Sequence, residues 1–239
     1  MSLNLVKFIL CFFMSVFVFN SKIFADHADD ASTPSIYKVT MTKLELCSSS
    51  ACNSPTILTE TSGTFNIASA TAGADVGSWI TSFELEIGKT YTHIRSTINT
   101  TFTISGYTSN SSISSSYCVT ESSPNTASDH AVAAIVDGSN STTSAEMSWV
   151  IPNEGDADNG AFYGDLSSDF STGSITKTND ASSFTWLGTL TNPYTPNINS
   201  APKITISFDV DHQLRSQQQA ADACYMWVLA PTVSVSLTD

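Results

Sequence analysis

Apolar and polar residues alternate over short stretches along most of this chain. In SFELEI (82–87), one aromatic and two aliphatic side chains alternate with a serine and two glutamates. In KITISFDVD (203–211), apolar side chains occupy every second position from Ile204 to Val210. A period of two sends successive side chains to opposite faces of an extended chain. Both stretches therefore predict strands with one face on a core and the other in water.

Two longer stretches extend this pattern. YTHIRSTINTTFTIS (91–105) predicts the longest strand, because its apolar residues share one parity: Ile94, Ile98, Phe102 and Ile104. The polar residues of the other parity, which we expect to face water, are His93, Arg95, Asn99 and Thr103. IYKVTMTKLEL (36–46) changes parity between Met41 and Leu44, which predicts a strand with a β-bulge.

Further short strands are predicted over 64–69, 132–136, 147–151, 184–190 and 233–237. Clusters of Gly, Pro, Asn and Ser separate them. About nine or ten strands in all indicate an all-β fold, an antiparallel β-sandwich of immunoglobulin-like or prealbumin-like type.

The rest of the chain offers little helical signal. LRSQQQAADA, Leu214 to Ala223, is the only stretch that suggests a helix. No internal repeat or linker forces a boundary, so we predict a single domain over 36–239. An insertion or subdomain over 140–198 is the alternative.

The chain opens with a basic residue and a short apolar run. Lys7 precedes the run Phe8–Phe19, of about twelve residues, and the small residue Ala25 ends the segment. This is typical of a secretory signal peptide, and the run is shorter than the roughly twenty residues of a membrane-spanning helix. We therefore expect a signal peptide over 1–25, a flexible acidic lead-in over 26–35, and no membrane insertion after cleavage.

The composition is acidic, with 22 Asp and Glu against 9 Lys and Arg and a net charge of −13. Loss of Lys7 and Lys22 with the signal peptide would bring the net charge to −15. Nucleic acid is a poor partner, because phosphate contacts need clustered basic side chains and the closest remaining pair is Lys38 and Lys43. An anionic membrane surface is disfavoured for the same reason.

Four cysteines remain after export: Cys47, Cys52, Cys118 and Cys224. An even number in an oxidising compartment favours disulfides, and three pairings are open. We expect Cys47–Cys52, which closes a small loop at a strand end, and Cys118–Cys224, each beside a tyrosine at the start of an apolar run. A zinc site is the rival reading, but the chain lacks a tight CxxC pair and a suitably spaced histidine.

The stretch NEGDADNGAFYGDLSSDFSTG (153–173) carries acids and glycines without a basic residue. Glu154, Asp156 and Asp158 fall on alternate positions, and Asp165 follows later. Alternate oxygens closed by a later carboxylate suit Ca²⁺, which takes about six to eight oxygen ligands. The stretch therefore predicts a calcium site formed by these four residues, with a solvated acidic loop as the alternative.

Three aromatic residues interleave with these acids: Phe162, Tyr163 and Phe170. They suit either of two roles, clamping the loop to the core or presenting a platform for sugar rings. The carboxylates would serve as general acid and base only if burial raised the pKa of one of them.

A second acidic group lies at the end of the 203–211 stretch. Asp209 and Asp211 share the outward parity beside His212, an arrangement suited to metal binding or hydrolysis. Asp129 and His130 would complete such a site only if the fold brought them close. The chain has no GxSxG, HExxH or P-loop motif, so an enzyme has no named nucleophile.

Four segments carry a resemblance to a known family: TFNIA (64–68), GKTYTHIRSTI (88–98), ISFDVD (206–211) and YMWVLAPTVSV (225–235). Their order resembles that in a family of bacterial exported β-sandwich (prealbumin-like) domains of unknown function, which show a similar G-x-Y-x-x-I-R strand and a late F-D-V followed by L-x-P-x-V. The resemblance covers about a third of the chain, which departs from the family in its cysteines and long middle section. It implies a secreted sandwich and no particular activity.

These observations favour an exported, non-enzymatic structural or binding module of the cell envelope or extracellular space. It would be periplasmic, cell-surface or secreted, stabilised by calcium, with a glycan or an envelope protein as partner. One alternative is a secreted hydrolase that uses carboxylates of the 154–169 loop with Asp209 and Asp211. Another is a surface-fibre subunit, whose open strand edge would accept a strand from a neighbour.

Overall fold

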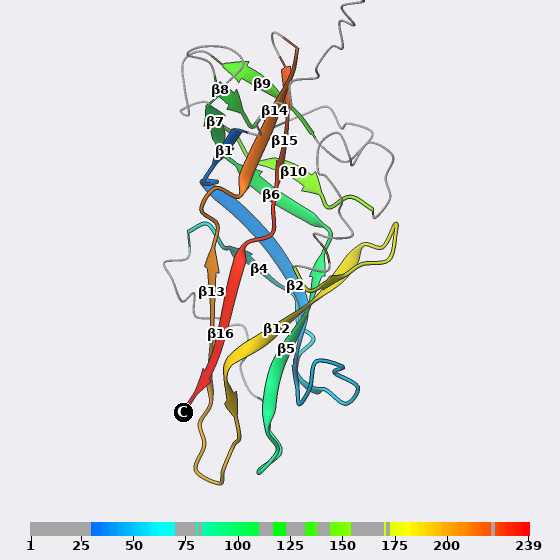
Figure 1. Ribbon diagram of the computed structural model, residues 1–239, viewed down its shortest axis with the longest axis vertical. Coiled ribbons are helices and arrows are strands. Elements are labelled where there is room, and N and C mark those ends of the chain that lie inside the picture. Colours follow the sequence, from blue (N-terminus) through cyan, green and yellow to red (C-terminus); the bar gives the residue numbers. More distant parts are fainter. Residues whose placement is uncertain are drawn as a thin grey trace, which may run out of the picture.

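The computed structural model describes residues 30–69, 80, 83–109, 117–122, 132–137, 144–153, 170, 173–220 and 223–239. Over these residues the chain forms sixteen strands and no helix, arranged in two sheets (Figure 1). The pairing is antiparallel except for one bridge, so the prediction of an all-β, sandwich-like fold is confirmed. Figure 1 shows an elongated molecule with the smaller sheet at one end and the larger sheet at the other.

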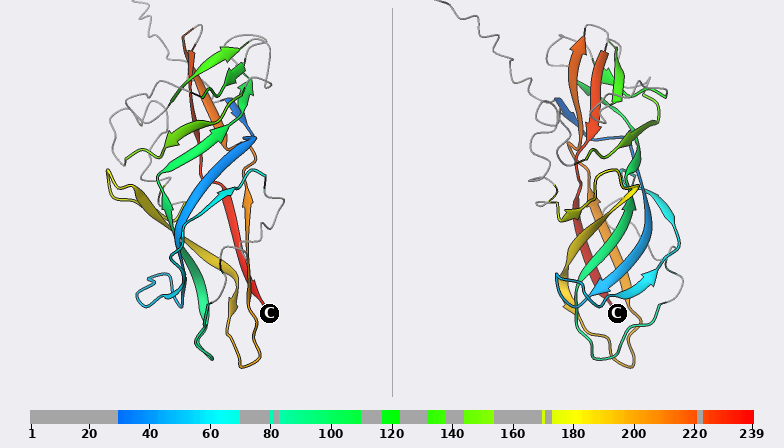
Figure 2. Two further views of the ribbon diagram at one scale, coloured as in Figure 1. Left: turned by 180° about the vertical axis from the view of Figure 1, so that it is seen from behind. Right: turned by 90° about the vertical axis from the view of Figure 1, so that its right-hand side faces the viewer.

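The larger sheet has ten strands, paired along the path β10-β6-β2-β5-β12-β16-β13, with β3 and β4 on β2 and β11 on β12. Its strands are Ile36–Cys47 (β2), Thr56–Thr59 (β3), Gly63–Asn66 (β4), Tyr91–Asn99 (β5), Thr101–Ser105 (β6), Met147–Val150 (β10), Ile175–Thr176 (β11), Ser183–Tyr194 (β12), Lys203–Asp209 (β13) and Thr232–Thr238 (β16). The sheet curls strongly and is close to a barrel in shape (Figure 2). Its inner face therefore surrounds side chains from strands along the whole path.

The smaller sheet has six strands in the order β1-β14-β15-β9-β8-β7. Its strands are Asp30–Ser32 (β1), Tyr107–Ser109 (β7), Tyr117–Val119 (β8), Val132–Asp137 (β9), Leu214–Ala220 (β14) and Ala223–Val228 (β15). Its two edges approach each other, since the Ser32 hydroxyl donates a hydrogen bond to the carbonyl oxygen of Tyr107. Short connections at Gly106, 210–213 and 229–231 carry the chain from one sheet to the other.

Strand β2 has the predicted bulge. Its register against β5 shifts between Met41 and Lys43. Before the shift Val39 and Met41 are buried, and after it Leu44 and Leu46 are buried, so the extra residue keeps both halves facing the core.

The strand predicted over 91–105 is interrupted at Thr100. β5 pairs with the later half of β2 and β6 with its first half. The Thr100 N–H donates to the carbonyl of Ser182 and its carbonyl accepts from the N–H of Ile151, each over 2.9 Å. Thr100 therefore ties the end of β10 to the start of β12, and from here β10 continues along β6 while β12 follows β5.

Two apolar clusters form the core. The first lies where the sheets meet and combines β2, β6 and β10 with β8, β14 and β15; its largest fully buried side chains include Ile104, Met147, Leu214, Met226 and Trp227. The second lies farther along the larger sheet, between β2, β5, β12, β13 and β16, and includes Leu44, Leu46, Tyr91, Ile94 and Ile206. The inward parities predicted for 91–105 and 203–211 agree with this burial.

The helix expected over 214–223 is wrong. This stretch forms β14 and the start of β15, which pair from Leu214 opposite Val228 to Ala220 opposite Ala223. Leu214 and Ser216 are buried, and the Ser216 hydroxyl lies 2.5 Å from that of Thr108. Pairing and burial with a period of two override the helical propensity of Leu, Arg, Gln and Ala.

The strand predicted over 82–87 is also wrong for the described residues 83–87, which pair with no other strand. Phe83 and Leu85 still pack against the second cluster, whereas Ile87 is 65 % exposed. A turn follows at once, closed by the Lys89 N–H donating to the carbonyl of Glu86 over 3.1 Å. The side chains of 83–87 alternate as in a strand, but the turn begins so soon that these residues cannot form a hydrogen-bonded ladder with another strand.

The predicted flexible lead-in (26–35) and the possible insertion (140–198) both contribute strands to the sheets. Within the predicted lead-in over 26–35, Asp30–Ser32 form β1 and pair with β14 from Asp30 opposite Ser216. Within 140–198, β10, β11 and β12 belong to the larger sheet.

Candidate functional site

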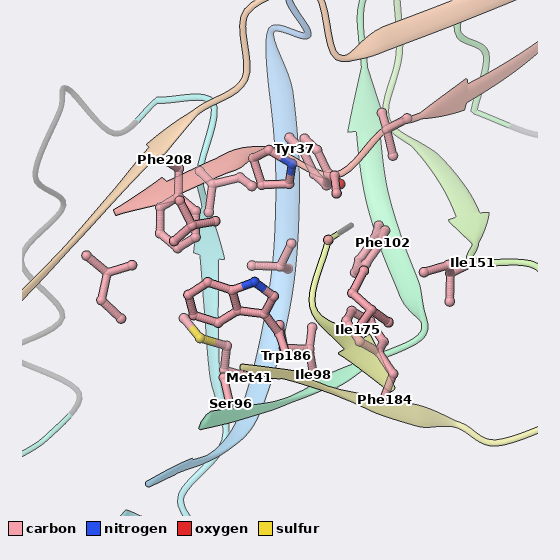
Figure 3. A pocket seen from close by; sticks show the side chains of 18 of the residues that line it. Tyr37, Met41, Ser96, Ile98, Phe102, Ile151, Ile175, Phe184, Trp186 and Phe208 are labelled. Carbon is pink, nitrogen blue, oxygen red and sulfur yellow. The ribbon is translucent and has the colours of Figure 1, made fainter. Parts of the chain in front are cut away.

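An apolar cavity lies inside the curl of the larger sheet (Figure 3). Its volume is about 100 Å³, enough for one aromatic ring or branched side chain. Most of its wall comes from side chains of β2, β5, β6, β10, β12, β13 and β16: Tyr37, Val39, Met41, Ser96, Ile98, Phe102, Trp149, Phe184, Trp186, Ile206, Phe208 and Val233. The curl that shapes the sheet thus also creates the cavity.

A wider cleft of about 540 Å³ continues from this cavity. Nine residues line both spaces: Trp149, Ile151, Gly173, Ile175, Trp186, Val228, Ala230, Pro231 and Val233. The cleft adds Leu187, Gly188 and Thr189 of β12 and Thr232 of β16. The inner cavity and the outer cleft therefore form one continuous space, with an apolar wall inside and a mixed apolar and polar wall outside.

Trp186 projects into the inner cavity and lines both spaces (Figure 3). Its ring lies over Gly188, two residues along the same face of β12. A Cβ atom at position 188 would lie 2.2 Å from Cη2 of Trp186, closer than two such atoms can pack. Glycine at 188 therefore permits the tryptophan ring to take this position between cavity and cleft.

Trp149 on β10 supplies an unpaired donor beside the cavity. Its ring stacks on Phe102 with centroids 5.6 Å apart and an angle of 22° between the planes. The side chain is only 3 % exposed, and its Nε1–H has no hydrogen-bond partner in the part of the chain that the structure describes. A buried indole N–H normally has a partner, so this one, which is itself covered from solvent, is an exception among the described residues.

Tyr37 is the one titratable residue in the described wall of the cavity. Its hydroxyl donates to the carbonyl of Leu229 over 3.2 Å. Burial raises the pKa of Tyr37 far above its ordinary value, so the phenol stays neutral. Tyr37 therefore ties β2 to the connection between β15 and β16, and its proton is engaged.

None of the described residues that line the cavity and cleft carries a charge. The polar ones are hydroxyl or amide side chains, such as Ser96, Ser174, Thr189, Gln213 and Thr232. Such a wall holds an apolar group and orients it through a few hydrogen bonds. Among the residues described, this wall provides no carboxylate or imidazole for proton transfer.

The calcium site predicted at Glu154, Asp156, Asp158 and Asp165 lies outside the described residues. Phe162 and Tyr163 lie outside them too. Phe170 is described: it is 7 % exposed, belongs to the first core cluster and lines the cleft. Of the two roles considered for these aromatics, Phe170 fits packing against the core.

Asp209, Asp211 and His212 lie close together on the surface. The Asp211 carboxylate accepts from the Thr33 hydroxyl over 2.5 Å and pairs with Nδ1 of His212 over 2.9 Å. The hydrogen bond from Thr33, followed by that from His212, lowers the pKa of Asp211 below its ordinary value. Asp209 caps the turn by accepting from the Asp211 N–H. These contacts close the link between β13 and β14 against the start of the described chain.

Asp129 and His130, considered as companions of this group, lie outside the described residues. Among the residues described, no group of three or more His, Cys, Asp and Glu side chains could hold a metal ion.

Both disulfides have the expected pairing. Cys47–Cys52 closes the loop between β2 and β3, with the two Cα atoms 5.0 Å apart. Cys118–Cys224 joins β8 to β15 within the smaller sheet, with the Cα atoms 6.0 Å apart. These four cysteines are therefore bonded in two pairs, and the bonds fit an oxidising compartment.

The sequence alone does not reveal the cavity. Ile98, Phe102 and Phe208 have the parity of core residues, and a period of two gives cavity walls the same signal. The signal that could have drawn attention to the site is Trp186 followed by Gly188, because glycine inside a strand often marks a close approach.

Comparison with known proteins finds no family model, no curated protein and no solved structure that matches this chain. The resemblance to exported prealbumin-like domains therefore stays an expectation. In the described part of the chain, no helix has the length and apolar character needed to cross a membrane.

Proposed function

We propose that this protein is an exported, non-enzymatic binding module that holds an apolar group in the inner cavity and outer cleft. The observation that carries the proposal is the continuous wall from the cavity to the cleft, in which none of the described residues is charged. Apolar sites with a few placed polar groups are the usual form of a ligand pocket.

The hydrolase alternative has less support. Acid and base catalysis needs a titratable side chain at the reacting atoms, and the described wall has only the engaged phenol of Tyr37. Asp209 and Asp211 are both exposed; Asp211 is engaged with Thr33 and His212, and Asp209 accepts a hydrogen bond from the Asp211 N–H. The carboxylates of the 154–169 loop keep the alternative open as a hypothesis.

The disulfides support export to an oxidising compartment, and we propose a periplasmic, cell-surface or secreted location. An immunoglobulin-like or prealbumin-like type, a stabilising calcium ion and an envelope or glycan partner stay proposals at this stage. The acidic net charge of −13 supports a partner other than nucleic acid.

The test uses N-phenylnaphthylamine, an apolar dye that fluoresces when it leaves water. Titration of the purified, oxidised protein should give saturable binding of one dye per chain. Ala230→Trp should reduce it strongly, because Ala230 is exposed and lines both spaces. Its exposed position lets the larger side chain block the site at little cost in folding.

The matched control is Ser48→Trp. Ser48 is exposed and lies in the loop closed by Cys47–Cys52, away from the cavity wall. This variant should bind the dye as the unmodified protein does. Absence of saturable binding, or an equal response of both variants, would contradict the proposal.

A further inference from the structure

Strands β12 and β16 are neighbours in the larger sheet but pair through a single bridge. Leu190 of β12 and Val235 of β16 form a single parallel bridge, and Oγ1 of Thr191 donates to the carbonyl of Val235 over 3.0 Å. From this point toward their N-terminal ends the two strands diverge, as Figures 1 and 2 show. The outer cleft lies in the space between them, bounded by 187–189 and 232–233.

The backbone of Val233 faces this space. β16 pairs with β13 along its length, and such a ladder uses every second residue of a strand. The carbonyl of Val235 faces β12, because it accepts the hydroxyl of Thr191. The backbone of Val233, two residues earlier, faces the same way.

This edge of β16 has no partner before Val235 in the described part of the chain. On the opposite side of the cleft, β12 is already engaged, since the Leu187 N–H donates to the carbonyl of Ser174 and Trp186 pairs with Ile175 of β11. Among the described strands that border the cleft, β16 is therefore the one whose backbone edge is unpaired there. An unpaired strand edge of this kind is a template for another strand.

The edge and the cavity together discriminate between ligands. A lipid tail would fill the cavity and leave the N–H and carbonyl of Val233 without partners. An extended peptide would pair with both groups and direct an alternate side chain into the cavity. The cavity of about 100 Å³ matches one large apolar side chain, and Thr232–Ser234 provide an edge of about 10 Å.

We infer that β16 accepts an extended strand from a partner polypeptide, which pairs with the Val233 edge and anchors an apolar side chain in the inner cavity. This inference rests on the proposed function, because it names the ligand of the same site. The net charge of −13 favours a strand flanked by basic residues.

The test uses a fluorescein-labelled synthetic peptide with alternating apolar residues, Lys-Thr-Val-Thr-Phe-Thr-Val-Thr-Lys, and the full chain in its oxidised form. Two control peptides carry N-methyl groups, one on the threonines and the other on Val and Phe. N-methylation removes donors and leaves the side chains unchanged, so one of the two should bind at least about tenfold more weakly. Hydrogen exchange of the Val233 amide should slow when the unmethylated peptide binds.

A variant gives a further check. Val233→Pro removes the donor at the edge and leaves the ladder to β13 intact, since proline is tolerated where its nitrogen faces away from a partner. It should weaken peptide binding by at least about tenfold. If this variant does not fold, binding of the methylated peptides and hydrogen exchange of the Val233 amide still test strand addition.

The outcomes separate the two proposals. If N-phenylnaphthylamine or laurate binds while the peptide does not, or while all three peptides bind equally, strand addition is wrong and the proposed function stands. If neither dye nor peptide binds, both are wrong. Peptide binding that depends on one set of backbone N–H groups and protects Val233 establishes strand addition.

Discussion

Nε of Arg95 on β5 donates to Oε2 of Glu45 on β2 over 2.7 Å, and the Glu45 side chain is only 3 % exposed. Lys43 lies 3.0 Å from the other carboxylate oxygen, and Nη1 of Arg95 also reaches the carbonyl of Cys52 over 3.5 Å. The pair therefore ties two neighbouring strands to the loop of the first disulfide. A carboxylate at this depth is stable only while its partners are present.

Replacing Arg95 should show how far the buried Glu45 carboxylate depends on its partners. Arg95→Met leaves the Glu45 carboxylate with Lys43 alone, and we expect the free energy of unfolding at pH 7 to fall by about 1–3 kcal/mol. Lys38→Met is the control, because the Lys38–Glu146 pair is 2.6 Å long but half-exposed and should contribute about 0–1 kcal/mol. Urea unfolding measures both. Equal losses in the two variants would contradict the prediction.

The same pair predicts a pH dependence. Burial, the largest influence, favours the neutral acid, but hydrogen bonds and charge from Arg95 and Lys43 outweigh it and hold the pKa of Glu45 below its ordinary value of 4.5. A lowered pKa in the folded state contributes stability that is complete above the ordinary value and is lost as pH falls through the folded pKa.

The difference in unfolding free energy between the unmodified protein and Glu45→Gln should therefore be constant above about pH 6 and shrink below the ordinary pKa. Urea unfolding of both proteins from pH 7 to pH 3 gives this difference. If this difference grew as the pH fell, the lowered pKa of Glu45 in the folded protein would be wrong.

The two disulfides should contribute unequally to stability. Their cysteines are separated by 5 residues in Cys47–Cys52 and by 106 residues in Cys118–Cys224. Closing a longer loop removes more entropy from the unfolded chain. We expect replacement of both cysteines by alanine to cost about 2 kcal/mol for the first pair and about 4–5 kcal/mol for the second. Thermal and urea unfolding of the two double variants compare them directly, and equal losses would argue against the loop-entropy account.

Gly188 should be intolerant of a side chain because of Trp186. In Gly188→Ala the added methyl group meets the indole ring, so the ring must move, at a cost of about 1–3 kcal/mol. The tryptophan emission should shift at the same time, since Trp186 lines the cavity. Trp186→Phe lacks the ring atoms that would clash, and in this background Gly188→Ala should cost much less. The same cost in both backgrounds would show that Trp186 is not the cause.

Features set by local periodicity were predictable from the sequence. The inward positions Ile204 and Ile206, and the bulge after Met41, follow from a period of two and a single change of parity. The pairing of Cys47 with Cys52 follows from a short loop at a strand end. In each case the residues that decide the structure are neighbours in the sequence.

Features set by distant partners were not predictable. Leu214–Ala220 has helical composition. It forms a strand because Leu214 pairs with Val228 of β15 and the Ser216 hydroxyl contacts that of Thr108. The cleft depends on the divergence of β12 and β16, which are joined by a single bridge between Leu190 and Val235. The angle at which β12 and β16 diverge cannot be read from the sequence of either strand alone.

The calcium site at Glu154, Asp156, Asp158 and Asp165 leads to a prediction about thermal stability. A ligand that binds only the folded state stabilises it by RT ln(1 + [L]/Kd), about 2.7 kcal/mol at a hundredfold excess over Kd. Millimolar calcium should therefore raise the melting temperature by several degrees relative to chelator. Asp156→Asn and Asp158→Asn should reduce this rise.

Controls separate a specific site from general screening of an acidic protein. Asp209→Asn and Asp211→Asn remove exposed acids elsewhere, so the rise with calcium should persist in these variants. Magnesium at the same concentration should have a smaller effect, because it needs a closer octahedral set of oxygens and gives up its water reluctantly. A rise of the same size with both ions and in all four variants would return the acids of the 154–169 loop to a solvated role.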